Sequence, residues 1–182
     1  MTNEEIIASI LEHKKNNRVA VFKNFFDNTP SWDDFIKYID ESSKQKSVIG
    51  KLTDQDISIG SKVIGNLLIK QDLYMYIPTH RHIGESEKIV DIFKTLNPKF
   101  NIRHMFINLS NTVDDVKTHH DKSDNFYWQC QGSVEWVGNG QTYKIDKGDL
   151  VFIPMDIGHG VNFNGPRAAV GFTTRILPEL YA

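Results

Sequence analysis

The chain has a single cysteine, no long apolar run and almost no net charge. Cys130 alone can form neither an internal disulfide nor a cysteine-based zinc site, which favours a reducing compartment. No apolar run approaches the ~18 residues that cross a bilayer, and residues 1–5 are acidic rather than basic. We therefore expect a cytoplasmic protein with no membrane partner.

Charge and length narrow the class of protein further. Lys and Arg total 21 against 23 Asp and Glu, so the sequence has no broad basic field that would attract extended nucleic acid. A chain of 182 residues suits one domain that buries roughly 70% of its unfolded surface. Without repeats or linkers, we expect a single domain over 1–182. Its N-terminal part, 1–100, would be helical and strand-rich, and 101–176 would form a barrel that carries the metal motifs.

The N-terminal part alternates helices and short strands. Apolar residues at helical spacing predict a helix over 3–16 with Asn3 as its cap, and a second helix capped by Ser31. Phe35 and Ile36 are expected on one apolar face of that second helix. A strand is expected over 18–22, short β-like runs over 47–77 and a third helix over 85–96.

Everything after residue 101 reads as strands separated by turns. The expected strands are 102–109, 116–120, 126–130, 134–137, 142–145, 150–153, 159–163 and 168–176. Eight short strands at this spacing, with helices gathered before them, predict a mainly β, cupin-like fold: a jelly-roll barrel of the double-stranded β-helix kind.

His119, Asp121 and a distant His159 form a candidate metal site. His119 and Asp121 are two residues apart, so on an extended strand both side chains leave the same face. Two histidines and one carboxylate on one side of a metal leave up to three positions open, as in non-heme Fe(II) oxygenases. A His-x-Asp pair by itself is common, so the prediction depends on the segment that supplies His159.

That second segment has the pattern of a buried strand that presents a histidine. A turn at 146–149 precedes the apolar run 150–153, and Pro154 ends the strand because proline cannot donate to a ladder. His159 then shares a face with Val161 and Phe163, which should look into the barrel. A core histidine satisfied by hydrogen bonds is the alternative for an isolated His159.

Residues 118–136 read THHDKSDNFYWQCQGSVEW, and this stretch resembles the first metal-ligand segment of Jumonji-type, cupin-like Fe(II)/2-oxoglutarate oxygenases. The segment 148–161 is similar to the second cupin motif. The resemblance implies Fe(II) held by His119, Asp121 and His159, which would also be the catalytic centre. It further implies 2-oxoglutarate and molecular oxygen as cosubstrates of a dioxygenase.

The site for the far carboxylate of 2-oxoglutarate departs from the common pattern. Many Jumonji-type enzymes place Lys or Arg where this chain has Val134, whereas the prolyl hydroxylase type places an Arg eight to ten residues after the second histidine. Arg167 stands eight residues after His159, and Arg175 follows on the same strand at an even spacing from Arg167, so it would share its face. The resemblance therefore implies Arg167, or Arg175, as the partner of that carboxylate. The alternative is that Arg167 is a surface residue at a strand end.

Other pocket residues follow from the same resemblance. Asn125 would hydrogen-bond the metal-proximal carboxylate of 2-oxoglutarate, and Tyr76 and Thr118 would line the opposite wall. His120 alternates with both proposed ligands and should point outward.

A rival metal site must be weighed, because His80, His82 and Glu87 imitate the histidine and glutamate spacing of a plain cupin motif. Pro78 and Gly84 instead indicate a loop that enters a helix, so the rival is the weaker interpretation.

The sequence thus predicts an Fe(II)/2-oxoglutarate-dependent hydroxylase of unknown substrate. A protein side chain or a small molecule fits the neutral charge better than extended nucleic acid, and a homodimer could supply a missing wall. The alternative is a metal-binding cupin that does not use 2-oxoglutarate and acts as an isomerase, a lyase or a small-molecule binder. Val134 in place of the basic residue motivates it.

Overall fold

The computed structural model describes residues 1–44, 49–52, 55–58, 73–77, 85–96, 102–108 and 113–173. Its elements are α1 Asn3–Lys15, β1 Ala20–Phe22, α2 Trp32–Lys44, β2 Ile49–Leu52, β3 Gln55–Ser58, β4 Leu73–Ile77, α4 Ser86–Leu96, β5 Ile102–Asn108, β6 Val113–His119, β7 Asn125–Gln131, β8 Val134–Gly138, β9 Gln141–Ile145, β10 Leu150–Ile153, β11 His159–Asn164 and β12 Arg167–Thr173.

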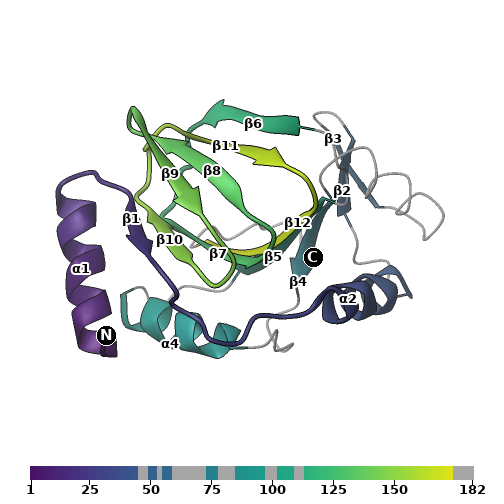
Figure 1. Cartoon of the computed structure of the whole chain (residues 1–182), viewed down its shortest axis with the longest axis horizontal. Coiled ribbons are helices and arrows are strands. Elements are labelled where there is room, and N and C mark those ends of the chain that lie inside the picture. The colour runs from purple at the N-terminus through teal and green to yellow at the C-terminus, as the bar shows by residue number, and fades with distance from the viewer. Residues whose placement is uncertain are drawn as a thin grey trace.

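Two antiparallel sheets face each other and form the barrel. The six-stranded sheet has the order β1-β10-β7-β12-β5-β4, and the four-stranded sheet has the order β6-β11-β8-β9. Figure 1 shows the four-stranded sheet above the six-stranded one, and β2 and β3 form a separate hairpin. This arrangement is a jelly roll. It confirms the fold class that the strand pattern predicted.

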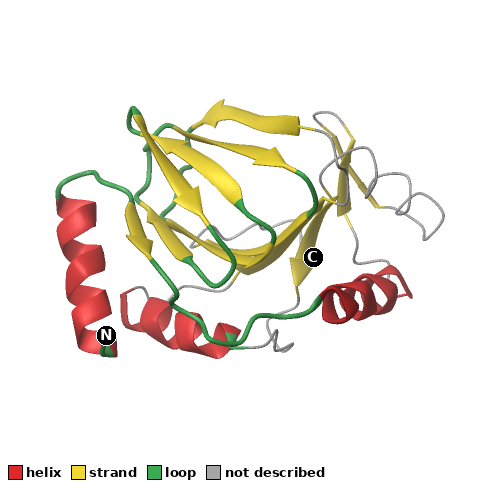
Figure 2. Cartoon of the chain, in the orientation of Figure 1, coloured by secondary structure: helices red, strands yellow, loops and turns green. Residues whose placement is uncertain are grey.

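Each sheet face has its own core. Along β7, the side chains of Phe126, Trp128 and Cys130 are buried in an outer cluster with residues of α1, α2 and α4. Tyr127, between them in sequence, belongs to a second cluster that fills the space between the sheets. This alternation follows from the two-residue period of a strand. Figure 2 shows α2 and α4 on the side of the six-stranded sheet away from the four-stranded one, and α1 beside its β1 edge.

Two details of the helices differ from the predictions. The cap of α1 is Thr2 rather than Asn3, because Thr2 Oγ1 accepts from Glu5 N while the Glu5 carboxylate accepts from Thr2 N. Ser31 caps α2 as predicted, through the equivalent exchange with Asp34. Ile36, however, is 57% exposed while Phe35 is fully buried, so the buried stripe of α2 is narrower than its apolar pattern.

The N-terminal part of the chain contributes strands to the barrel itself. β1 pairs with β10, and β4 pairs with β5, so both edges of the six-stranded sheet come from before residue 100. The division of the single domain at residue 100 stays a prediction. Among the described helices, none is long and apolar enough to span a bilayer.

Candidate metal centre

Strand pairing brings the three predicted ligands together. His119 is the last residue of β6, His159 is the first residue of β11, and the two are direct partners in the antiparallel register. Their ring centroids lie 4.4 Å apart. Asp121 follows β6 after one residue, and one ligand atom from each of the three side chains lies within 4.8 Å of the others. This spread is suited to ligands around one metal ion.

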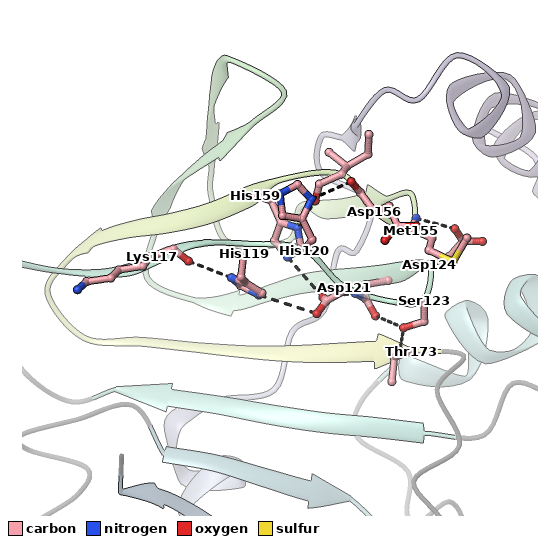
Figure 3. Close-up of polar contacts among 12 residues, drawn as sticks. Lys117, His119, His120, Asp121, Ser123, Asp124, Met155, Asp156, His159 and Thr173 are labelled. Atoms are coloured by element: carbon pink, nitrogen blue, oxygen red, sulfur yellow. Dashed lines mark hydrogen bonds and ion pairs between the residues drawn. The ribbon is translucent and has the colours of Figure 1, made fainter. Parts of the chain in front are cut away.

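Hydrogen bonds fix which nitrogen each histidine presents. The Nδ1 atoms of His119 and His159 lie 3.0 Å and 2.8 Å from the carbonyl oxygens of Lys117 and Ile157. A carbonyl only accepts, so Nδ1–H donates in both rings and Nε2 is the nitrogen left to bind a metal. The Nε2 atoms face Asp121, at 4.0 Å and 3.5 Å from its carboxylate oxygens (Figure 3). Metal-binding histidines are commonly oriented in this way.

Asp121 is oriented by Asn125, the first residue of β7. The Nδ2 atom of Asn125 donates a hydrogen bond to a carboxylate oxygen of Asp121. Ser123 Oγ in turn lies 3.4 Å from Asn125 Oδ1 and 2.5 Å from Thr173 Oγ1, which ties the group to the end of β12 (Figure 3). The structure therefore shows Asn125 in contact with a proposed metal ligand. Its predicted bond to 2-oxoglutarate stays a prediction.

The loop before His159 is fastened to the loop after His119. Asp156 N donates to Asp121 O at 2.9 Å, and Met155 N donates to Asp124 Oδ1 at 2.9 Å. His120 lies outside the ligand cluster, and its Nδ1 is 2.9 Å from Asp156 O. These contacts join the two ligand-bearing segments through the protein itself.

The three ligands differ in exposure. The side chain of His159 is 3% exposed, whereas those of His119 and Asp121 are 46% and 38% exposed. β6 is an edge strand of its sheet, which explains why its ligands reach solvent. A metal here would be covered on the β11 side and open on the β6 side.

Arg167 lies inside the barrel and not on its surface. It is 2% exposed, its Nη1 donates to Tyr127 OH at 2.7 Å, and its guanidinium carbon is 4.2 Å from the centroid of the Phe163 ring. Phe163 is the register partner of Val134. The β12 arginine therefore places its cation in the layer of the barrel where the sequence has Val134 instead of a basic residue. The surface interpretation of Arg167 is wrong.

Two aromatic residues connect this arginine with the ligands. The ring of Trp136 is stacked on His159 with centroids 5.3 Å apart, and Tyr127 meets Trp136 edge-on at 4.9 Å. Neither residue was predicted from the sequence to take part in the site. The signal was available, because Tyr127 on β7 and Trp136 on β8 occupy inward positions of the strand alternation.

The structure says less about the remaining predicted site residues. Thr118 is exposed and alternates with His119 along β6, so it lies on the opposite face of the strand, and its pocket role stays a prediction. Tyr76 lies on β4 as the register partner of His104. Arg175, His80 and His82 lie outside the described residues, and Glu87 is in the first turn of α4.

Comparisons with known proteins support the fold. No protein-family model matches the chain, and no curated protein matches its sequence. Among solved structures, the ribosomal oxygenase YcfD from Escherichia coli in complex with cobalt and 2-oxoglutarate is 18% identical, with a TM-score of 0.68 over 96% of this chain. The complex of YcfD with cobalt and succinic acid gives 15% and 0.68 over 93%.

The chain spans about half the length of these YcfD chains, with 53% and 51% of each covered. At this identity the likeness concerns the fold. The chain therefore shares a jelly-roll fold with these structures, as its strand pattern predicted.

Proposed function

We propose that this chain is an Fe(II)- and 2-oxoglutarate-dependent oxygenase that hydroxylates a C–H bond of its substrate. The observation that carries the proposal is the convergence of His119 Nε2, His159 Nε2 and the Asp121 carboxylate. Two imidazoles and one carboxylate with open positions suit a non-heme Fe(II) oxygenase. The shared fold with a cobalt- and 2-oxoglutarate-bound oxygenase supports it.

The residues present fit Fe(II). Lys117 O and Ile157 O accept hydrogen bonds from Nδ1 of the two imidazoles and leave Nε2 directed at the ligand cluster, and Asn125 orients the carboxylate. When bound, the iron and its cosubstrate would supply the oxidising chemistry: 2-oxoglutarate and oxygen yield succinate and carbon dioxide while a substrate C–H becomes C–OH. The chain contributes the ligands and their orientation.

Arg167 would hold the far carboxylate of 2-oxoglutarate. A buried dianion needs a cationic partner, because an unpaired buried charge is very costly. The Arg167 guanidinium is fixed by Tyr127 and Phe163, and a guanidinium can bind a carboxylate through two parallel hydrogen bonds. The apolar cluster around it, which includes Val134 and Val161, would exclude water.

A second candidate function is a metal-binding cupin without 2-oxoglutarate, acting as an isomerase, a lyase or a small-molecule binder. The specific observation in its favour is Val134, which is buried where many Jumonji-type enzymes have a basic residue. It shares the metal centre with the first proposal and differs in the cosubstrate alone.

Anaerobic titration with Fe(II) and then 2-oxoglutarate tests the proposal. A keto acid that chelates iron gives a weak visible charge-transfer band, which we expect in the native protein. His119→Ala and His159→Ala should abolish it, whereas His13→Ala, which removes a histidine on α1, should leave it unchanged. Iron binding without a band would favour the second candidate function, and absence of iron binding would refute both.

Arg167→Met tests whether Arg167 binds the far carboxylate of 2-oxoglutarate. Methionine keeps an unbranched side chain over Phe163 but removes the charge. We expect at least a tenfold weaker 2-oxoglutarate affinity with unchanged Fe(II) affinity, since a charge-assisted pair contributes roughly 1.5–3 kcal/mol. Arg18→Met at an exposed position is the control. An unchanged affinity in Arg167→Met would remove Arg167 from the site.

A further inference from the structure

Two indole N–H groups are buried without an acceptor among the described residues, those of Trp128 and Trp136. They belong to different cores. Trp128 lies in the outer cluster, with its ring 4.2 Å from that of Phe26. Trp136 lies in the cluster between the sheets and is stacked on His159. An unpaired buried donor is costly, so each one requires an explanation.

The position of Trp136 distinguishes it from Trp128. Its ring touches a proposed metal ligand on one side, at 5.3 Å and 25° from the His159 ring. On the other side it touches Tyr127, whose hydroxyl accepts from the buried guanidinium of Arg167. The indole therefore contacts a proposed metal ligand on the covered side of the metal and, through Tyr127, adjoins a fixed cation.

The chemistry of this inner face selects an anion. Trp136 offers an N–H donor and Arg167 a positive charge. Among the described residues, the inward positions of β7, β8, β11 and β12 include no carboxylate. A ligand with carboxylate oxygens would accept hydrogen bonds from these two groups.

We propose that the Trp136 indole N–H donates a hydrogen bond to a carboxylate oxygen of a ligand held on the metal. The proposal rests on the metal centre of the proposed function, but it holds for a simple carboxylate as well as for 2-oxoglutarate. Trp136 is thereby a ligand-binding residue, and its orphaned donor is satisfied when the site is filled. Stacking on His159 would fix the direction of the donor.

Trp136→Phe and Trp128→Phe form a matched pair of variants, because each removes one unpaired buried N–H and keeps an aromatic ring. Co(II) serves as the probe metal, and its visible d–d spectrum reports first metal binding and then titration with acetate or 2-oxoglutarate. We expect Trp136→Phe to keep its Co(II) affinity within about twofold and to weaken both carboxylates about tenfold. Trp128→Phe should change neither affinity by more than about twofold.

The outcomes separate this proposal from the proposed function. Equal carboxylate affinities in Trp136→Phe and the native protein would overturn the role of Trp136 and leave the oxygenase proposal standing. Loss of Co(II) itself in Trp136→Phe would also overturn it, because the indole would then act on His159 alone. If the native protein binds acetate but not 2-oxoglutarate, 2-oxoglutarate is refuted as the cosubstrate. The acetate titration then still tests whether Trp136 binds a carboxylate. A native protein that binds no Co(II) refutes both.

A measurement on the unaltered protein avoids dependence on how the variants fold. Each of Trp32, Trp128 and Trp136 gives one indole N–H signal in a proton–nitrogen correlation spectrum. In the Zn(II)-loaded protein, acetate or 2-oxoglutarate should move the Trp136 indole proton downfield and leave the other two in place. A Trp136 signal that does not respond at saturating carboxylate would overturn the proposal.

Discussion

At the scale of single residues, a strand's two-residue period decides what each side chain of this barrel can do. His119 and His159 are register partners at the ends of β6 and β11, so both side chains leave the same face of the sheet. Cys130, on the opposite parity of β7 from Tyr127, lies instead in the outer core and is fully buried. The same strand alternation that places the two histidines in the site places the cysteine in the outer core.

Burial of Cys130 gives a prediction about pH. Desolvation raises the pKa of its thiol well above the ordinary value of 9.0, so the folded state keeps the proton while the unfolded state loses it above pH 9. Unfolding releases this proton at high pH, and the stabilisation that is present below pH 9 is therefore lost as the pH rises further. Between pH 9 and pH 10, urea unfolding should show that the native protein loses roughly 1 kcal/mol more stability than Cys130→Ala.

The native thiol should also resist a disulfide reagent at pH 8 and react once the protein unfolds. Rapid modification of the folded protein, or identical pH dependence in Cys130→Ala, would contradict the burial of this side chain. Exposed groups elsewhere titrate equally in both proteins, so the comparison isolates the thiol.

At the scale of elements, the segment between β10 and β11 is as important as the strands. Pro154 and the turn before it were readable in the sequence, because proline ends a ladder. The contacts of Asp156 were not readable, since they join residues about 35 positions apart through backbone groups. Sequence periodicity therefore predicted where His159 points, but not what holds its loop against Asp121.

His120→Ala tests whether this loop positions the ligands. It removes the His120 contact with Asp156 O and leaves the three proposed ligands intact. Loss of one such hydrogen bond, about 0.5–1.5 kcal/mol, should weaken Co(II) binding roughly three- to tenfold. Lys122→Ala removes a solvent-exposed ion pair with the same Asp156 and should change the affinity less than about twofold.

Isothermal titration of both variants gives the comparison directly. Equal Co(II) affinities in His120→Ala and Lys122→Ala would show that the backbone bonds of Asp156 and Met155 suffice to hold the loop. The coordination spectrum of bound Co(II) should stay that of the native protein in both, since neither variant changes a ligand.

At the scale of the whole molecule, the jelly roll and the place of the metal ligands followed from the strand pattern, whereas the chemistry of the barrel interior did not. The resemblance implied Arg167 as a cosubstrate residue, but its contact with Tyr127 becomes visible only when β12 lies against β7. Trp136 likewise needs β8 paired with β11 to reach His159. Contacts between strands distant in sequence carry no local periodicity, which is why single-sequence reasoning missed them.

The ligands join two separate segments of the barrel, so metal binding should stabilise the whole fold. His119 and Asp121 come from the end of β6, and His159 from the start of β11. An ion that binds the native state alone adds about 2.7 kcal/mol at a hundred times its Kd, which for a domain of this size is about 5–10 °C in Tm.

Calorimetry with and without Co(II) should show that increase in the native protein and in His13→Ala, but not in His159→Ala. Because the hydrogen bonds of Asp156 and Met155 already hold the loops together, the apoprotein should still unfold in one cooperative transition. An apoprotein with no such transition would mean that the metal, and not these contacts, assembles the site. An unchanged Tm at saturating Co(II) would argue against a metal centre at these three residues.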